Sequence, residues 1–182
     1  MPHVLVLDSP PPAEDATQSF RTFVEAHQRF VYGLALHLTG QHHDADDLSQ
    51  EVFIKAHRAY GDLRDYTAAQ AWLRRIAITT YLNTKRKKAW QVLSFFGVFR
   101  EADQPRITPE AGYERADWWH TVHAALRHLT SRERAAFVLR HLHDLSTAET
   151  AAAMDVAEGT VKSLLHRAAR KLRPHVQHLR NM

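Results

Sequence analysis

The sequence contains no cysteine, which excludes both a disulfide framework and a metal site built from thiolates. Long apolar runs are also absent, because no stretch approaches the ~20 apolar residues that a membrane span requires. The run Val4–Leu7 is short, has no basic flank and ends at Asp8, so it does not fit a signal peptide. These absences predict a cytoplasmic protein with no membrane insertion.

The alternation of apolar and polar residues that is typical of a strand is missing as well. The 182 residues suit one domain or two small ones, and a hydrophobic content of 45% is sufficient to form their cores. The formal net charge is +4, which favours a polyanionic partner.

The N-terminal half is predicted to form helices after a flexible tail. Residues 1–16 contain three consecutive prolines and no periodic pattern. From residue 17 onward apolar residues recur every three or four positions, which predicts a helical domain over residues 17–89. Gly40 is expected to end its first helix, Asp44 to cap its second, and the basic run Lys85–Lys88 to end its third.

A change of pattern separates this domain from the rest. Residues 90–111 begin with an apolar segment, Val92–Phe99, that shows no clear helical stripe, and Pro105 and Pro109 follow it. This range is interpreted as a flexible linker with an apolar segment that packs on one domain or on a partner. Helical spacing resumes in residues 112–182. The predicted fold is therefore all-α, with two small helical domains joined by a linker.

The segment Leu145–Leu172 has the pattern of a helix-turn-helix, two short helices joined by a tight turn. Ser146 and Glu149 have the spacing of a capping box at the first helix start, and Thr130 and Glu133 have the same spacing at the start of the preceding helix. Asp155 is expected to take the left-handed conformation in the turn, which Asp tolerates better than most residues. The second helix is predicted to bury an apolar stripe and to expose basic side chains beside it. The stripe comprises Val161, Leu165, Ala168 and Leu172, and the basic residues include Lys162, His166, Arg167 and Arg170.

Motifs in both halves resemble the extracytoplasmic-function (ECF) sigma factors, the small promoter-recognition subunits of bacterial RNA polymerase. Asp44–Ala56 (DADDLSQEVFIKA) and Trp72–Ala77 (WLRRIA) are similar to region 2 of that family, and Gly159–Ser163 (GTVKS) and His166–Ala168 (HRA) to its region 4. The resemblance covers roughly residues 20–88 and 124–176. It implies a sigma factor without enzymatic activity or cofactor, which recognises the −10 and −35 promoter elements and starts transcription.

The resemblance also implies partners and residue roles. The helix that carries Asp47, Gln50 and Glu51 corresponds to the surface that docks on the clamp helices of core RNA polymerase, and the flap is the further contact on the polymerase. The implied −10 contacts are Arg64, Tyr66, Thr67, Arg74, Arg75, Thr79, Asn83, Lys85 and Arg86. The implied −35 contacts are Thr160, Lys162, Ser163, His166, Arg167 and Arg170. An anti-sigma factor that covers both polymerase-binding faces is the other implied partner.

Some positions depart from the family pattern. Thr79 stands where the family usually has an asparagine that reads a base, and a hydroxyl cannot reproduce that bidentate edge. Leu164 and Ala169 replace frequent arginines in the recognition helix, which predicts fewer phosphate contacts.

Two alternative functions are open to simple tests. A conventional helix-turn-helix regulator fits residues 145–172 but would bind promoter DNA without polymerase. A metalloenzyme would use the 14 histidines, with His37, His42, His43, Asp44, Asp46 and Asp47 as the cluster. The adjacent His42 and His43 do not have the i, i+4 spacing of paired ligands on a helix. His141 and His143 are instead expected at a helix end, where protonation suits the dipole.

Overall fold

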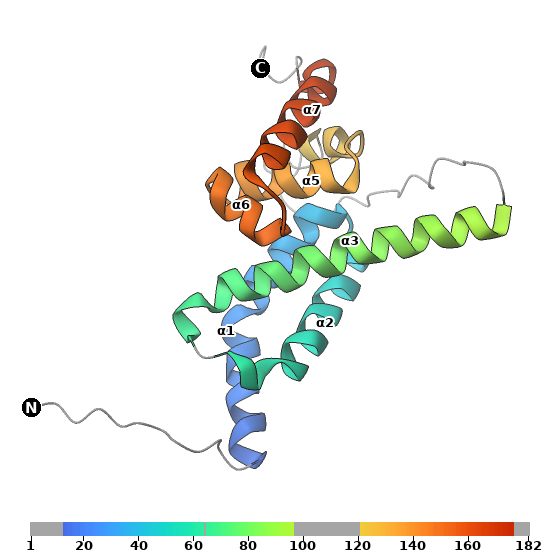
Figure 1. Cartoon of the computed structure of the whole chain (residues 1–182). Coiled ribbons are helices and arrows are strands. Elements are labelled where there is room, and N and C mark those ends of the chain that lie inside the picture. Colours follow the sequence, from blue (N-terminus) through green and yellow to red (C-terminus); the bar gives the residue numbers. More distant parts are fainter. Residues whose placement is uncertain (1–12, 64, 97–120, 177–182) are drawn as a thin grey trace, which may run out of the picture.

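The computed structural model describes residues 13–63, 65–96 and 121–176, and within these ranges the chain is helical with no strand (Figure 1). The N-terminal half consists of α1 (Ala13–Thr39), α2 (His42–Arg58), the turns η1 (Tyr60–Asp62) and η2 (Tyr66–Ala68), and α3 (Ala69–Phe96). The C-terminal half consists of helical residues 121–126, α5 (Ser131–Phe137), the π-helical turn η3 (Val138–Leu142), α6 (Thr147–Met154) and α7 (Glu158–Val176).

Several element boundaries differ from the prediction. Helix α1 begins at Ala13, inside the predicted tail, and residues 1–12 lie outside the described part of the chain. Gln41, not Asp44, is the N-cap residue of α2, and Asp44 lies in the first turn of that helix. Helix α3 continues to Phe96, inside the predicted linker of residues 90–111, and the rest of that linker lies outside the described residues.

The core of the N-terminal half is formed where α1, α2 and α3 meet. Val31, Leu34 and Leu38 of α1 are fully buried against Val52 of α2 and Leu73 of α3. Their spacing of three or four residues places the apolar side chains on one face of each helix, as the sequence predicts. Gly40 ends α1 with a φ of +78°, in the left-handed region that glycine adopts without strain.

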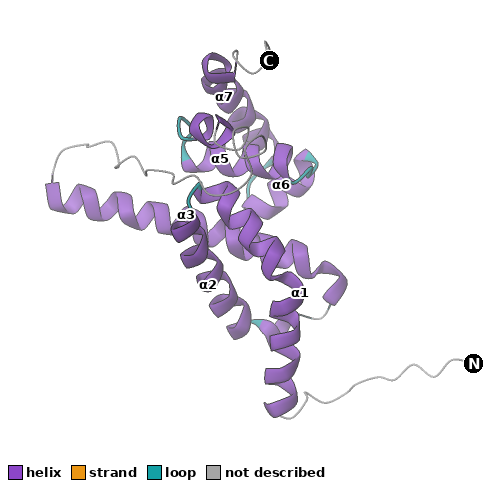
Figure 2. Ribbon diagram, turned by 180° about the vertical axis from the view of Figure 1, so that it is seen from behind, coloured by secondary structure: helices purple, strands orange, loops and turns teal. Residues whose placement is uncertain are grey.

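The C-terminal half does not stand apart from the N-terminal half. Figures 1 and 2 both show the C-terminal helices next to the N-terminal half, with α5 and α6 packed on α3 and α7 packed on α5 and α6. The buried apolar side chains of both halves form one continuous cluster. A buried arginine of α5 also crosses between the halves, because Arg134 Nη1 donates to the carbonyl oxygens of Leu38 at 3.0 Å and Thr39 at 3.2 Å. The described part of the molecule is therefore closed, with its two helical halves in direct contact.

Candidate functional site

The helix-turn-helix is built from local hydrogen bonds that the sequence signals. Ser146 Oγ accepts from the backbone N–H of Glu149 at 3.1 Å, and Glu149 Oε2 accepts from the N–H of Ser146 at 2.8 Å, so the predicted capping box is present. Asp155 follows α6 with φ +54° and ψ +52°, which confirms the predicted left-handed turn residue. Helix α7 then begins at Glu158.

Helix α7 buries Val161, Ala168 and Leu172 of the predicted stripe, but Leu164 takes the place of Leu165. Leu164 is only 4% exposed, whereas Leu165 is half-buried. The interpretation of Leu164 as a lost phosphate contact is therefore wrong, because this side chain belongs to the core. The opposite face is open: five of the predicted −35 residues are exposed and Thr160 is half-buried. The exposed residues are Lys162, Ser163, His166, Arg167 and Arg170.

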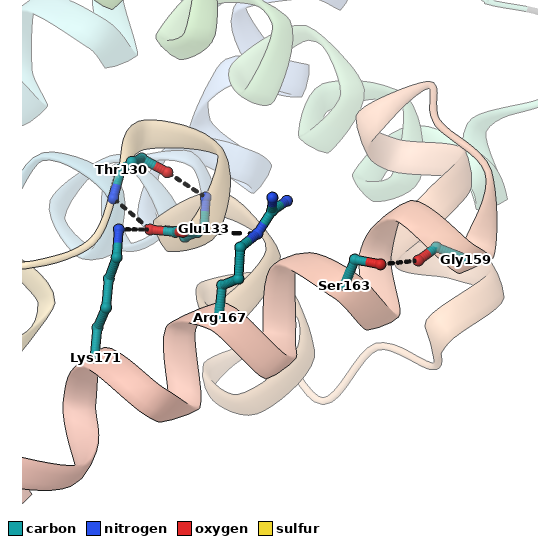
Figure 3. Close-up of polar contacts among 6 residues, drawn as sticks. All are labelled: Thr130, Glu133, Gly159, Ser163, Arg167 and Lys171. Atoms are coloured by element: carbon teal, nitrogen blue, oxygen red, sulfur yellow. Dashed lines mark hydrogen bonds and ion pairs between the residues drawn. The ribbon is translucent and has the colours of Figure 1, made fainter.

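A buried carboxylate fixes α7 against α5 (Figure 3). Glu133 closes the second predicted capping box with Thr130, and its Oε2 also accepts from Lys171 Nζ at 2.7 Å. Arg167 Nε lies 3.9 Å from Glu133 Oε1 on the same side of α7. Ser163 Oγ donates to the carbonyl of Gly159 at 2.9 Å and keeps its lone pairs for an outside donor. The recognition helix is thus preorganised by contacts of Lys171 and of two predicted −35 residues, Ser163 and Arg167.

The ionisation of Glu133 follows from these contacts. Burial alone raises the pKa of this carboxyl, but the hydrogen bonds from Lys171 and Thr130 and the Lys171 charge outweigh burial, so the pKa lies below its ordinary value. Sequence reasoning found the capping role of Glu133 but missed its role in holding α7. In the structure this buried capping acid pairs with basic residues far along the chain. The spacing of residues in the sequence does not reveal such a contact.

The predicted −10 loop is organised by an aspartate that sequence reasoning did not single out. Asp65 Oδ1 accepts from the backbone N–H of Thr67 at 2.8 Å and from its hydroxyl at 2.6 Å, and these bonds hold the pKa of Asp65 below its usual range. Tyr66 between them is 58% exposed and meets Tyr60 edge-on. The loop therefore presents an aromatic ring to solvent. Arg64 lies outside the described residues.

The predicted −10 residues of α3 are in different environments. Arg74 is half-buried, with its guanidinium carbon 5.4 Å from the centre of the Phe30 ring, and burial lowers its pKa. Arg75 is exposed, and its Nη2 lies 3.8 Å from Asp155 Oδ1. Thr79 and Arg86 are exposed, while Asn83 and Lys85 are half-buried.

The three predicted polymerase-binding residues share the outer face of α2. All are exposed, and Asp47 and Glu51 are held by neighbours four residues away: His43 at 3.7 Å from Asp47 and Lys55 at 3.3 Å from Glu51. This face borders a groove of about 880 Å³ between α1 and α2. The groove is lined by Phe20, Val24, Gln28, Arg29, Tyr32, Asp46, Ser49, Gln50, Phe53, Ile54 and His57.

Ile54 extends this face beyond what the sequence indicated. It is 47% exposed and lies four residues after Gln50, so the two side chains occupy one helix face. The visible signal was an isoleucine outside the buried stripe of α2. An exposed isoleucine among charged residues supplies the apolar contact that a docking surface requires.

Metal chemistry finds no support at the described residues. No group of three or more histidine, aspartate or glutamate side chains there is arranged to hold a metal ion. His43 Nδ1 lies 3.7 Å from Asp47 Oδ2, whereas His42 Nδ1 is hydrogen-bonded to the Tyr32 hydroxyl at 2.7 Å, so the adjacent histidines point to different partners. Across the described helices, none is both long and apolar enough to cross a membrane.

Comparison with protein-family models gives two matches that correspond to the two halves. Residues 23–91 match the sigma-70 region 2 model, and residues 120–172 match the sigma-70 region 4 model. The capped helix-turn-helix lies in the second match, and the outer face of α2 lies in the first.

Curated relatives align over most of the chain. The RNA polymerase sigma-E factor of Streptomyces avermitilis is 32% identical over 162 residues, which cover 87% of this chain and 85% of the relative. The ECF RNA polymerase sigma factor SigM of Mycobacterium tuberculosis is 34% identical over 155 residues, covering 85% and 75%. The ECF RNA polymerase sigma factor SigE of Mycolicibacterium smegmatis is 34% identical, over 88% of this chain and 63% of the relative.

Solved structures share the fold. The sigma factor RpoE of Bartonella quintana, in complex with the anti-sigma factor NepR, aligns with a TM-score of 0.68 at 24% identity, over 88% of this chain and 98% of that chain. CnrH, in complex with the cytosolic domain of CnrY, aligns with a TM-score of 0.59 at 23% identity, over 91% of this chain and 94% of that chain.

Proposed function

Since the chain belongs to the sigma-70 family, and within it to the ECF sigma factors, we propose that it acts in the cytoplasm as a promoter-specificity subunit with no catalytic activity of its own. It joins core RNA polymerase, recognises the −10 and −35 elements and starts transcription. One observation carries this proposal: a single chain combines an exposed docking face on α2 with a capped helix-turn-helix whose second helix exposes basic side chains.

The docking face on α2 is assigned to the polymerase clamp helices. Asp47 and Glu51 supply carboxylates that pair with basic side chains, Gln50 supplies an amide, and Ile54 supplies apolar area at the edge of the groove. A mixture of this kind combines the desolvated contact that gives affinity with charges that steer association.

Two sets of DNA contacts are assigned by their exposed chemistry. Tyr66 offers a ring on which an unstacked base of the −10 element can stack, and Arg74, Arg75 and Arg86 supply cations for phosphates. At the −35 element, Lys162, Ser163, His166 and Arg167 reach base edges in the major groove, while Arg170 contacts the backbone.

An anti-sigma factor is the proposed regulatory partner. The two solved sigma factors described above were each determined in complex with another protein, in one case named as an anti-sigma factor. The open groove between α1 and α2 offers such a protein a binding surface next to the docking face, so the bound protein competes directly with polymerase.

The proposal is tested by transcription in vitro with core bacterial polymerase on a genomic promoter library, with start sites mapped. Wild-type protein is expected to produce new start sites that core polymerase alone does not. Ile54→Glu is expected to reduce polymerase affinity at least tenfold, because it places a charge in the apolar part of the interface. Ala26→Glu, an exposed change on α1 outside the groove lining, is the control and is expected to retain transcription.

Absence of new start sites would refute the proposal. Binding of one promoter by the chain without polymerase, at an affinity that polymerase does not improve, would instead favour a conventional helix-turn-helix regulator.

A further inference from the structure

The C-terminal half covers part of the predicted DNA-facing surface of α3. Helix α6 packs against α3, where Arg75 pairs with Asp155 at 3.8 Å and Arg74 experiences the charge of Glu149. The proposed function gives both arginines to DNA phosphates. The closed arrangement therefore places both cations near carboxylates of the same chain.

A closed chain of this size also cannot reach both promoter elements. Elements centred at −10 and −35 are about 25 base pairs apart, or about 85 Å at 3.4 Å per base pair. A compact chain of this length has a radius of gyration of about 16 Å. Under the proposed function the two halves must therefore separate before both elements are bound, and the contacts between the halves oppose that step.

Besides the packing of α5 and α6 on α3, contacts between the halves lie at the C-terminal end of α1. Arg134, 8% exposed, donates to the carbonyls of Leu38 and Thr39 and interacts with Tyr81 of α3. A guanidinium at the end of α1 also complements the negative end of the helix dipole. Gly40, which ends α1 with a φ of +78°, lies at the same point, and a Cβ there would be in van der Waals contact with His123 and Arg134.

Two histidines from opposite halves meet near the same end of α1. His37 Nδ1 lies 3.1 Å from His143 Nε2, and the His143 ring also meets Phe30 edge-on. Both histidines are half-buried. A hydrogen bond between two imidazoles requires a lone pair on one of them, so the contact exists only while at least one ring is neutral.

The surroundings of this pair are mostly cationic or capable of becoming so. The groups are His123 from residues 121–126, Arg74 and Tyr81 from α3, Arg134 from α5, and Arg140, His141 and Asp144 near His143. Asp144 is the carboxylate among them, and it is exposed. A second positive charge on the pair would therefore meet repulsion that one solvated carboxylate does not offset.

We propose that the histidine junction, formed by His37, His143 and Arg134, is a proton-sensitive latch that keeps the two halves closed when neutral and releases them on acidification. Release exposes Arg74, separates Arg75 from Asp155 and frees the C-terminal half to move. The consequence for DNA rests on the proposed function, whereas the latch itself is a property of the free chain.

Burial, followed by the charges of His37 and Arg74, lowers the pKa of His143 to about 4. Burial likewise lowers the pKa of His37. His141 and His143 lie at the end of η3, as the sequence predicts, but burial lowers the pKa of both, so the expectation that protonation is favoured there is wrong.

Linkage gives the sign and size of the effect. A solvated histidine in the open state has a pKa of about 6.5, so protons bind the open state more tightly and the closed state loses stability as pH falls from about 6.5 toward 4. Between pH 7.5 and 5.5, His143 alone is expected to raise the ratio of open to closed molecules about tenfold. Protonation of His37 adds to this change.

The latch is tested on the full chain by energy transfer between dyes, without DNA or polymerase. The sequence has no cysteine, so Ala26→Cys on α1 and Ala169→Cys on α7 provide exposed labelling sites on opposite halves. Wild type is expected to lose transfer efficiency as the pH falls from 7.5 to 5.5, with unchanged helical circular dichroism. His143→Gln keeps a hydrogen-bonding side chain but does not titrate. It is expected to make the pH-dependent rise in the ratio of open to closed molecules about tenfold smaller.

Matched variants make the result decisive. His43→Gln removes an exposed histidine outside the junction and is expected to behave as wild type. Arg134→Met is expected to shift the ratio toward open molecules at both pH values. Transfer efficiency that is independent of pH, an equal response in His143→Gln and wild type, or loss of helicity together with opening would each overturn the latch. None of these results would affect the transcription assay at neutral pH, so failure of the latch and of the proposed function are distinguishable.

Discussion

Gly40 ends α1 at the point where the two halves meet, and its backbone conformation requires glycine. Its φ of +78° is in the region that L side chains rarely adopt, whereas a Cβ there would make only ordinary contacts with His123 and Arg134. Gly33, in the interior of α1, has no atom within 4 Å of a built Cβ. The two glycines therefore provide opposite expectations for the same substitution.

We predict that Gly40→Ala lowers the free energy of unfolding by about 1–2 kcal/mol, the cost of a left-handed alanine. Gly33→Ala is expected to raise it by about 0.5–1 kcal/mol, because alanine is the better helix former and meets no obstacle. Urea denaturation followed by circular dichroism measures both. A stabilising Gly40→Ala would contradict the backbone conformation described for this position.

At the scale of the element, α7 is positioned by its contact with the first turn of α5. Glu133 caps α5 and, through Lys171 and Arg167, ties the same turn to the middle of the recognition helix (Figure 3). Glutamine can also close a capping box, so Glu133→Gln removes the negative charge while retaining the cap. The substitution therefore separates the two roles of this side chain.

Glu133→Gln is expected to lower the free energy of unfolding by about 1 kcal/mol at pH 7, since Lys171 and Arg167 are partly solvated. The folded-state pKa of Glu133 lies below its ordinary value of 4.5, so its charge stabilises above that pH and the effect is lost as pH falls through the folded-state pKa. Denaturation of both proteins at pH 7 and pH 3 is expected to show a smaller difference in the free energy of unfolding at pH 3. The control is Glu25→Gln, which alters an exposed ion pair with Arg21 and should cost less than about 0.5 kcal/mol.

At the scale of the whole molecule, closure neutralises part of the surface assigned to DNA. The pair of Arg75 and Asp155 joins α3 to the turn of the helix-turn-helix, and both side chains are exposed, so it contributes at most about 1 kcal/mol. Asp155 is in the left-handed region, which asparagine also tolerates, so its charge can be removed without changing the turn.

Asp155→Asn is expected to strengthen binding of the chain to single-stranded −10 DNA by about threefold at low salt, with the gain falling as salt screens the pair. Asp144→Asn makes the same charge change at another exposed, left-handed aspartate, which is not paired with Arg75. Fluorescence anisotropy measures both affinities. Equal gains in the two variants would indicate a general charge effect and exclude release of Arg75.

The local features of this protein were determined by the sequence. Both capping boxes, the left-handed Asp155 and the glycine at the end of α1 appear where the residues predict them. Each depends on hydrogen bonds or backbone preferences within a few residues, so the information is contained in a short segment. The family motifs are equally local, which is why the region 2 and region 4 relationship was visible in the sequence.

The relation between the two halves was decided by the tertiary structure. The sequence predicts two domains on a linker, whereas His37 and His143 meet although 106 positions separate them, and Arg134 caps a helix from the other half. Which face of α7 is buried, with Leu164 inside, also depends on the shape of the surface against which it packs. Helical spacing fixes which residues share a face, but burial and charge at the junction arise only when distant segments pack, and those long-range contacts set the ionisation of the histidines.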